Sequence, residues 1–444
     1  MLSLNNHYFF LPENKALVKG SKHSIIIDFE SGRTYRVNRS ASRIIELGEQ
    51  GFKVEEAVEK LGSELKGSSI ISFIEKLVEQ GLLLLSSNPK PQSSDKPSEL
   101  KLDFIWIEVT PNCNLQCIHC YTEARVNKDE QLEALSKDEI ERVIGEAAEL
   151  GCRKIQFTGG EPTLRSDLKS LIEYAKVKGF ELIEIFTNGT LLTEPMIKFL
   201  AEQKVNVAMS IYSYRAETHD AITKVPGSFE KTMNSLKLLL AYGVPTRCEI
   251  VAMRQNEKEL EATSYFLYQL GVYTRPPDPI RPSGRGRNME NWPTEYGQAF
   301  LQTKPSFIIS WENYEKNKRW NSCWFGKAAV TSSGNVIPCV FARDQVAGNV
   351  KHQSLAEIIL GEKMLRLWGL NRDQIEVCRD CEYRYVCDDC RPWAYGLTGN
   401  LYAKSPRCTY NPYTGEWEKK ETFLNVKGGC VGRPETLVQQ DSTL

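Results

Sequence analysis

The stretch that decides the fold is Cys113-Asn114-Leu115-Gln116-Cys117-Ile118-His119-Cys120, which follows an apolar segment, Phe104 to Val109, and the dipeptide Thr110-Pro111. Three thiolates in one tight loop can hold three irons of a cubane cluster and leave the fourth iron for a ligand that is not protein. The alternative is a structural zinc site, which closes its tetrahedron with a fourth protein ligand and commonly uses paired Cys-x2-Cys clips. The Cys-x3-Cys-x2-Cys spacing therefore favours an iron-sulfur cluster with an open iron.

The composition sets limits on location and partners. A chain of 444 residues has room for a catalytic core and one or two smaller domains. With 56 basic and 57 acidic residues, no bulk electrostatic argument favours nucleic acid or an anionic membrane. No apolar run reaches the roughly 18 residues of a membrane span, and the N-terminus lacks a secretion signal. We therefore expect a cytoplasmic protein with no nucleic-acid or membrane partner, whose closely spaced cysteines bind metal rather than form disulfides.

Residues 1–88 are predicted to form a separate winged-helix-like domain, followed by a polar, proline-rich linker over residues 89–101. The expected strands are His7 to Leu11, Ser24 to Phe29 and Thr34 to Val37, and the expected helices are Ala41 to Glu49, Val54 to Leu61 and Ser69 to Gln80. The alternatives are a stabilising cap or a DNA-binding winged helix. Glu75, Lys76 and Glu79 on the third helix do not make a phosphate-binding face.

The central domain, residues 102–310, alternates strands and helices up to about residue 282. Strands are expected at Phe104 to Val109, Lys154 to Thr158, Leu182 to Phe186, Val205 to Ile211, Arg247 to Ala252 and near Val272, with helices near 136–150, 166–179, 194–203, 228–242 and 256–270. Repeated strand-helix units imply a parallel sheet with helices outside. About six units are too few for an eight-stranded barrel, so the predicted fold is α/β, a partial (β/α)6 barrel of the TIM type.

Polar motifs follow the predicted strands, at the edge where such folds carry their chemistry. After the second strand, Gly159-Gly160-Glu161 lets backbone approach a ligand closely and offers a carboxylate to an ammonium group. Thr187-Asn188-Gly189 follows the third strand, and Ser210 ends the fourth. Turn formation and strand capping explain such residues nearly as well, above all for Asn188-Gly189.

A second group of cysteines lies in residues 311–425, ahead of a tail at 426–444. Its members are Cys323, Cys339, Cys378, Cys381, Cys387, Cys390 and Cys408. A zinc ribbon would account for the four from Cys378 to Cys390 taken alone.

Together these motifs resemble the radical S-adenosylmethionine enzymes, whose signature is the cysteine spacing described above with an aromatic residue, here His119, before the last cysteine. The resemblance implies a 4Fe-4S cluster on Cys113, Cys117 and Cys120 that binds S-adenosylmethionine. It implies cofactor contacts from His119, Gly159, Gly160, Glu161, Thr187, Asn188 and Ser210. In the family, reductive cleavage of the cofactor yields a 5′-deoxyadenosyl radical that abstracts a hydrogen atom from substrate. A small electron donor such as flavodoxin or ferredoxin is an expected partner.

The C-terminal cysteines resemble the SPASM extension of these enzymes, which carries two auxiliary 4Fe-4S clusters and so implies three clusters in all. The third spacer of the central run has two residues, where the commonest family pattern has three. The resemblance implies a first auxiliary set of Cys323, Cys339 and Cys390, and a second auxiliary set of Cys378, Cys381, Cys387 and Cys408. In fully ligated members of the family that the chain resembles, a fourth thiolate lies a few residues before the first cysteine of this set, but residues 315–322 contain no cysteine. We therefore expect an open iron at the first auxiliary set, which binds a cysteine of the substrate.

The N-terminal domain resembles the PqqD-like leader-recognition domain of enzymes that modify ribosomally made peptides, including the phrase Val37-Asn38-Arg39-Ser40-Ala41. The resemblance implies a precursor peptide as partner, whose leader adds a strand to a sheet edge. The expected product is a crosslink in the core peptide, a sulfur-to-carbon thioether before a carbon-carbon bond.

Three other functions stay open at this point. The first is peptide epimerisation, with Cys248 in the fifth strand delivering a hydrogen atom from the barrel interior. The second is maturation of a small molecule or of a protein side chain, and the third is a zinc-binding regulator that is not an enzyme. Arg285 or Arg287, in a connector that also resembles the family, is a candidate contact for a peptide carboxylate.

Overall fold

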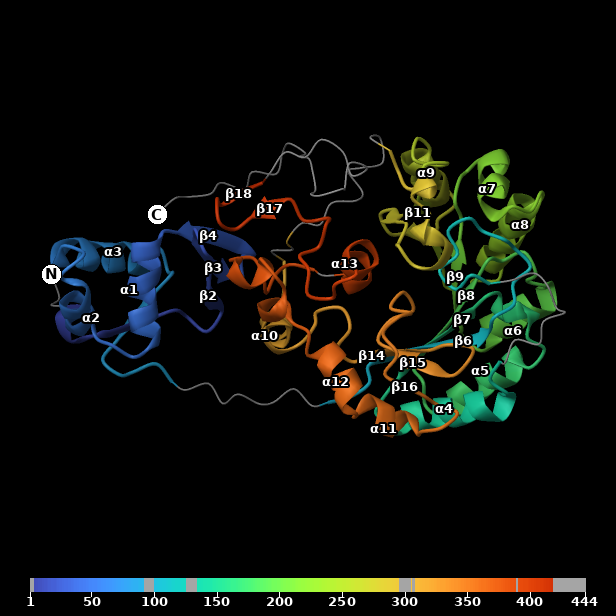
Figure 1. Cartoon of the computed structure of the whole chain (residues 1–444), viewed down its shortest axis with the longest axis horizontal. Coiled ribbons are helices and arrows are strands. Elements are labelled where there is room, and N and C mark those ends of the chain that lie inside the picture. The colour runs from blue at the N-terminus through green and yellow to red at the C-terminus, as the bar shows by residue number, and fades with distance from the viewer. Residues whose placement is uncertain are drawn as a thin grey trace.

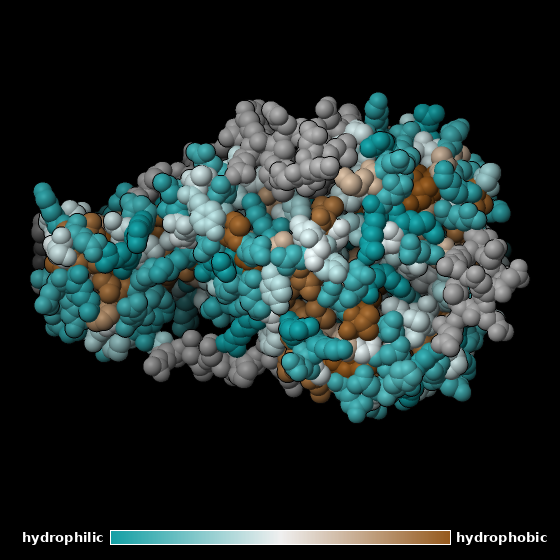
Figure 2. Space-filling model, in the orientation of Figure 1, coloured by the Kyte–Doolittle hydropathy of each residue, from teal (hydrophilic) through white to brown (hydrophobic). Residues whose placement is uncertain are grey.

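The computed structural model describes residues 4–91, 100–124, 134–294, 305, 308–388 and 390–417. Most of the expected linker and the whole expected tail lie outside these residues. The N-terminal domain and the central α/β domain are at opposite ends of the molecule, and the cysteine-rich C-terminal part lies between them (Figure 1). Hydrophilic residues cover most of the face seen in Figure 2, and the apolar patches on it are scattered.

The N-terminal domain has two small sheets and three helices. Its elements are β1 (Tyr8–Phe10), β2 (Lys15–Lys19), β3 (Ser24–Asp28), β4 (Arg33–Val37), α1 (Arg39–Glu49), α2 (Val54–Leu61), α3 (Gly67–Glu79) and β5 (Leu84–Ser86). Strands β2, β3 and β4 form an antiparallel sheet, and β1 pairs with β5. Helix capping explains the asparagine in the segment Val37 to Ala41. The Asn38 side chain caps α1 by accepting the Ala41 N–H at 2.9 Å. Strands β2 and β5 are additional to the expected strands.

The central sheet has nine strands in the order β12-β10-β9-β8-β7-β6-β14-β15-β16. Its strands are β6 (Phe104–Thr110), β7 (Lys154–Gly159), β8 (Leu182–Thr187), β9 (Asn206–Ser210), β10 (Thr246–Glu249), β12 (Tyr273–Thr274), β14 (Lys327–Val330), β15 (Asn335–Ile337) and β16 (Gly348–Asn349). The six expected strands are present, and neighbours among them pair in parallel, which confirms the α/β prediction. Strand β14 of the C-terminal part continues the sheet by pairing in parallel with β6.

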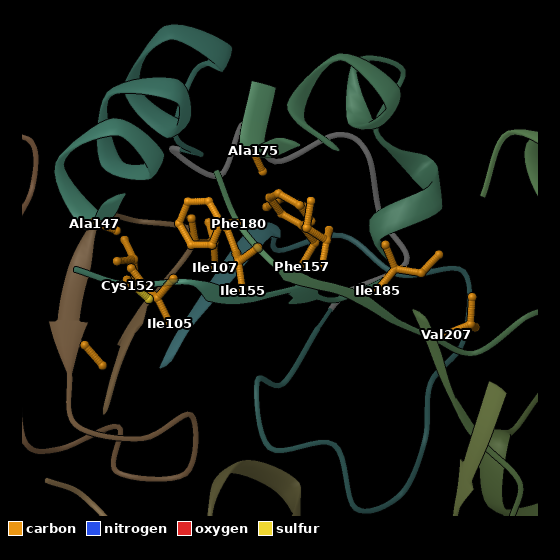
Figure 3. Packing of buried hydrophobic residues seen from close by; sticks show 14 of the residues in the cluster. Ile105, Ile107, Ala147, Cys152, Ile155, Phe157, Ala175, Phe180, Ile185 and Val207 are labelled. Carbon is orange, nitrogen blue, oxygen red and sulfur yellow. The ribbon is translucent and has the colours of Figure 1, made fainter. Parts of the chain in front are cut away.

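Helices cover the outer face of the parallel strands. They are α4 (Lys137–Glu149), α5 (Leu168–Val177), α6 (Glu194–Glu202), α7 (Ala216–Thr223), α8 (Ser228–Ala241) and α9 (Leu260–Gln269), of which α7 is additional to the prediction. Alternate strand residues such as Ile105, Ile107, Ile155 and Phe157 are fully buried against these helices, as Figure 3 shows. A strand alternates its side chains between two faces, so the residues between them point to the inner face.

The C-terminal part packs against both other parts of the chain. Its helices are α10 (Trp311–Arg319), α11 (Leu355–Ile359), α12 (Glu362–Trp368) and α13 (Arg391–Thr398), and its last strands are β17 (Tyr410–Asn411) and β18 (Glu416–Trp417). Ser21 N–H donates to Asp380 O at 2.7 Å and Lys22 N–H to Pro412 O at 3.1 Å, which joins the β2-β3 turn to the cysteine-rich region. Within the described ranges, no helix is long and apolar enough to cross a membrane.

Candidate functional site

The cysteine loop follows β6 and lies at the carboxyl ends of the parallel strands. Burial raises the pKa of Cys113 to about 11 and that of Cys117 to about 12, and each thiol lies near the other members of the trio. The Cys113 Sγ accepts the Leu115 N–H at 3.4 Å, and the Cys120 Sγ lies 3.2 Å from the Thr122 hydroxyl. Buried thiols with donors already aimed at sulfur suit a cationic metal centre, which would deprotonate them on binding.

The glycine pair at the end of β7, Gly159 and Gly160, is required by backbone packing against the start of the cysteine loop. Gly160 N–H donates to Thr110 O and Glu161 N–H to Asn112 O, both at 2.8 Å. A Cβ on Gly160 would lie 2.0 Å from Asn112 O, and one on Gly159, where φ is +135°, would lie 2.4 Å from Thr110 O. The glycine pair therefore positions the segment that leads into Cys113.

We expect Gly160→Ala to lower the thermal unfolding midpoint by about 5 °C or more, because the added methyl collides with backbone that cannot turn aside. Gly145→Ala is the matched control, since its Cβ would meet only ordinary contacts at 3.6 Å and beyond inside α4. Alanine in a helix interior should leave the midpoint unchanged or raise it slightly. Calorimetry on both variants checks this, and equal midpoints would contradict the packing argument.

Glu161 is fully buried, and its carboxylate joins the loops after β7 and β8. Oε1 accepts from the Thr163 N–H at 3.0 Å, the Thr163 hydroxyl at 2.5 Å and the Thr187 hydroxyl at 2.6 Å. Oε2 accepts the Asn188 N–H at 2.8 Å. Burial raises the pKa of this carboxyl, and these four donors partly offset the rise. Oε2 is the oxygen with acceptor capacity left, so a contact with a cofactor amino group stays a prediction at that atom.

Asn188 ties the β8 loop to the cysteine loop. Its Nδ2 donates to Asn114 Oδ1 at 2.9 Å and to Cys113 Sγ at 3.8 Å. Asn114 in turn donates to the Thr190 hydroxyl at 2.7 Å. Among the expected cofactor contacts, Thr187 and Asn188 are thus brought next to both Glu161 and the first cysteine.

His119 is half-buried and packs against an aromatic side chain. Its ring lies 4.8 Å from that of Tyr212 in an edge-on arrangement, and burial lowers the pKa of His119 to about 3, so the imidazole is neutral. No motif pointed to Tyr212, which follows Ser210 by two residues. The signal was present as an aromatic residue directly after the fourth strand. Ser210 itself ends β9 opposite Glu249.

The connector after the sixth strand clamps the cysteine loop. Arg285 Nε donates to Cys117 O at 2.9 Å and Nη1 to Ala124 O at 3.2 Å, while the Arg285 N–H donates to Cys120 O at 3.0 Å. Asn291 Nδ2 donates to Ile118 O at 3.1 Å. Arg285 Nε and Nη1 thus bind loop carbonyls, while its buried Nη2 has no hydrogen-bond partner among the described residues, so a substrate carboxylate at Arg285 stays a prediction. Arg287 pairs with Asp344 at 2.7 Å near the surface.

Cys248 does not face the barrel interior, so its predicted role as a hydrogen-atom donor is wrong. It belongs to the outer core against the helices and is 1 % exposed. Register explains the difference: Cys248 lies opposite Met209, another outer-core residue, whereas Arg247 alternates with it and bonds Glu184 at 2.8 Å. Because side chains alternate along a strand, a shift of one residue decides whether the thiol faces the helices or the barrel interior.

Several of the C-terminal cysteines lie near one another. Cys339 lies near Cys323 and Cys390, and burial raises the pKa of Cys339 to about 12. Cys381 lies near Cys378 and Cys387, and its pKa is also raised by burial. Cys381 and Cys408 pack against the same apolar cluster. The assignment of ligands to individual clusters stays a prediction.

The N-terminal sheet belongs to an apolar cluster that contacts two cysteines of the second auxiliary set. This interdomain apolar cluster contains Ala16, Val18, Ile25 and Ile27 from β2 and β3 together with Tyr314, Tyr383, Val386 and Tyr410, and the partly exposed Cys381 and Cys408 pack against it. Sequence patterns did not indicate this contact between the two parts of the chain.

No His, Cys, Asp or Glu side chains in the described part of the chain converge in threes on a point suited to one metal ion. The fit of iron-sulfur clusters therefore rests on the donor sets and their hydrogen bonds.

Comparisons with known proteins agree with this geometry. A model of the Radical SAM superfamily matches residues 107–267, and a model of SPASM, an iron-sulfur cluster-binding domain, matches residues 323–382. An AdoMet-dependent heme synthase of Methanosarcina barkeri is 28% identical over 337 residues, which cover 69% of this chain and 95% of the relative. The antilisterial bacteriocin subtilosin biosynthesis protein AlbA of Bacillus subtilis is 27% identical over 351 residues, covering 75% and 74% respectively.

Among solved structures, Streptococcus suis SuiB bound to the precursor peptide SuiA has a similar fold, with a TM-score of 0.55 at 14% identity. The similarity covers 89% of this chain and 98% of that one.

Proposed function

The chain belongs to the radical SAM superfamily and carries a SPASM iron-sulfur domain, and we propose that it crosslinks the core of a ribosomally made precursor peptide. The observation that carries the proposal is the unpaired outer edge of β4. Among the described residues, β4 pairs only with β3. An extended peptide can add to such an edge through main-chain hydrogen bonds.

The direction of the β4 backbone groups follows from the hairpin register. Gly20 N–H donates to His23 O, so in the β2-β3 ladder the next pair, Lys19 and Ser24, points its backbone groups outward. Continuing this alternation, Ile26 bonds toward β4 at Tyr35, and the Thr34 N–H points away from β3. This donor is the one that we expect a leader strand to meet.

The opposite edge of the sheet is less accessible to a peptide. The guanidinium of Arg384, from the C-terminal part, donates to Lys19 O on the outer edge of β2. The β2-β3 face is covered by the interdomain apolar cluster. The β4 edge is therefore the site we assign to the leader.

Residues of the central site would hold the cofactor groups. Cys113, Cys117 and Cys120 would hold the cluster, while Glu161, Thr187, Asn188 and Ser210 would contact S-adenosylmethionine. When bound, these groups supply a radical that removes a carbon-bound hydrogen. The chain's own contribution is to fix the cysteine loop through Gly160, Asn188 and Arg285 and to exclude water from it.

We propose a thioether as the product, with a carbon-carbon crosslink as the fallback. A thioether removes two hydrogens from the peptide: one leaves carbon as an atom, and the thiol loses a proton to solvent and an electron to an iron-sulfur acceptor. The first auxiliary set offers three thiolates, and helix α10, which precedes it, contains no cysteine. A substrate thiolate would complete that set.

A porphyrin-modifying enzyme is the second candidate, favoured by the 28% identity to the AdoMet-dependent heme synthase. To separate the two, reconstituted enzyme is incubated anaerobically with S-adenosylmethionine, dithionite and either substrate. The peptide is the one encoded by a short reading frame beside the gene, and the alternative is an iron porphyrin. We expect the peptide to stimulate 5′-deoxyadenosine formation at least tenfold and the porphyrin to leave it at the uncoupled rate. Stimulation by the porphyrin alone would refute the proposal.

A further inference from the structure

Arg372 contacts two cysteines of the second auxiliary set. It begins a 3-10 turn, Arg372–Gln374, and is only 6 % exposed. Its Nη1 donates to Cys378 Sγ and its Nη2 to Cys387 Sγ, each at 3.5 Å. Nη2 also donates to Cys387 O at 3.2 Å and to Asp388 O. One guanidinium thus spans two cysteines that are nine residues apart in sequence.

A guanidinium in this position needs negative charge around it. Burying a cation is costly unless it is paired and hydrogen-bonded. Neutral thiols are weak acceptors, whereas thiolates that ligate a cluster carry charge and accept stronger hydrogen bonds. The rigid fork of arginine also fixes the separation of the two sulfurs, which a lysine cannot do.

We propose that Arg372 is a positioning residue for the second auxiliary cluster: it brings Cys378 and Cys387 to one cluster and raises the reduction potential of that cluster. Reduction adds negative charge, and hydrogen bonds to the ligand sulfurs stabilise the reduced form. The proposal rests on the proposed ligand set and is independent of which substrate the enzyme modifies.

Two neighbouring arginines differ from Arg372 in their contacts. Arg384 bonds to Lys19 O, to Cys381 O at 2.9 Å and to Asp373 at 2.8 Å. Arg379 is adjacent to Cys378 in sequence, yet its side chain is 63% exposed and solvent screens its charge. Arg379 therefore offers a control in which the same charge is removed without loss of a bond to sulfur.

The test is a redox titration of reconstituted full-length enzyme followed by electron paramagnetic resonance, repeated in the C113A/C117A/C120A background to isolate the auxiliary signals. We expect Arg372→Met to lower the reduced-to-oxidised ratio of one auxiliary cluster about tenfold at the wild-type midpoint, or about 59 mV for one electron. Arg372→Lys should lower the midpoint potential less than Arg372→Met does, and Arg379→Met should leave it unchanged.

Iron content keeps the proposal testable if the methionine variant assembles poorly. Loss of one cluster's iron from the Arg372 variants, with full iron in Arg379→Met, supports the positioning role. Full iron with an unchanged midpoint in both Arg372 variants overturns the proposal, and so does an equal loss of iron from Arg379→Met.

Discussion

Replacing Cys113, Cys117 and Cys120 together by alanine is expected to abolish 5′-deoxyadenosine formation while the auxiliary iron stays bound. The physical reason is that this loop alone gathers the side chains of β7, β8 and the connector around three sulfurs, through Asn188 and Arg285. The two auxiliary sets lie on other elements and keep their own donors, such as the Tyr383 N–H at 3.4 Å from Cys381 Sγ. Loss should exceed a hundredfold, since no other cysteine set is expected to hold the iron that binds S-adenosylmethionine.

Liquid chromatography of the quenched reaction measures 5′-deoxyadenosine, and iron and sulfide analysis measures the clusters that remain. Cys152→Ala is the matched control, because this buried cysteine packs in the outer core and is not one of the three cysteines of the loop. Retained cofactor cleavage in the triple variant would be fatal to the assignment of the site.

The second large effect is expected at the edge of the N-terminal sheet. Thr34→Pro removes an outward-facing N–H from β4 and should weaken leader binding at least tenfold, because a strand added to this edge loses a main-chain bond and meets the proline ring. The β3-β4 ladder keeps its own bonds, which involve Tyr35 rather than Thr34. Uncoupled cofactor cleavage should therefore stay normal.

Thr34→Ala is the control, since it removes the same side chain and keeps the N–H. Fluorescence anisotropy with a labelled precursor peptide gives both affinities. If the two variants bind alike, the β4 edge is not where the leader docks. Deleting residues 1–88 would be a less specific test, because the deletion also removes the part of the interdomain apolar cluster that β2 and β3 contribute.

The parallel sheet and the cysteine loop were predictable from sequence, because each depends on a pattern of residues that are close together in the chain. Apolar strand residues such as Ile155 and Phe157 alternate with polar ones, and short spacers place Cys113, Cys117 and Cys120 in one loop. Strand bounds agreed within one or two residues from β6 to β9. Helix α7 was missed because its buried face, His219, Ile222 and Thr223, shows little apolar periodicity.

Sequence patterns did not predict contacts between segments that are far apart in the chain. Whether Cys248 faces the helices or the interior depends on the register of its strand in the sheet. The flanking residues Arg247 and Glu249 do not by themselves show that register. From sequence alone, Arg285 could not be distinguished from an exposed arginine, because only the fold brings the Cys117 carbonyl to its side chain. Arg372 likewise stands in an unremarkable polar stretch, and only the fold brings Cys378 and Cys387 to it.

The mass of the precursor peptide after anaerobic turnover tests the central claim most directly. Enzyme, S-adenosylmethionine and reductant are incubated with the full precursor, and the product is alkylated at free thiols before high-resolution mass spectrometry. We predict a peptide lighter by two hydrogen atoms per crosslink, with one fewer alkylated cysteine for each, and no such change in a precursor whose core cysteines are replaced by serine. A precursor of unchanged mass with every thiol free, in a reaction that still forms 5′-deoxyadenosine, would contradict the account.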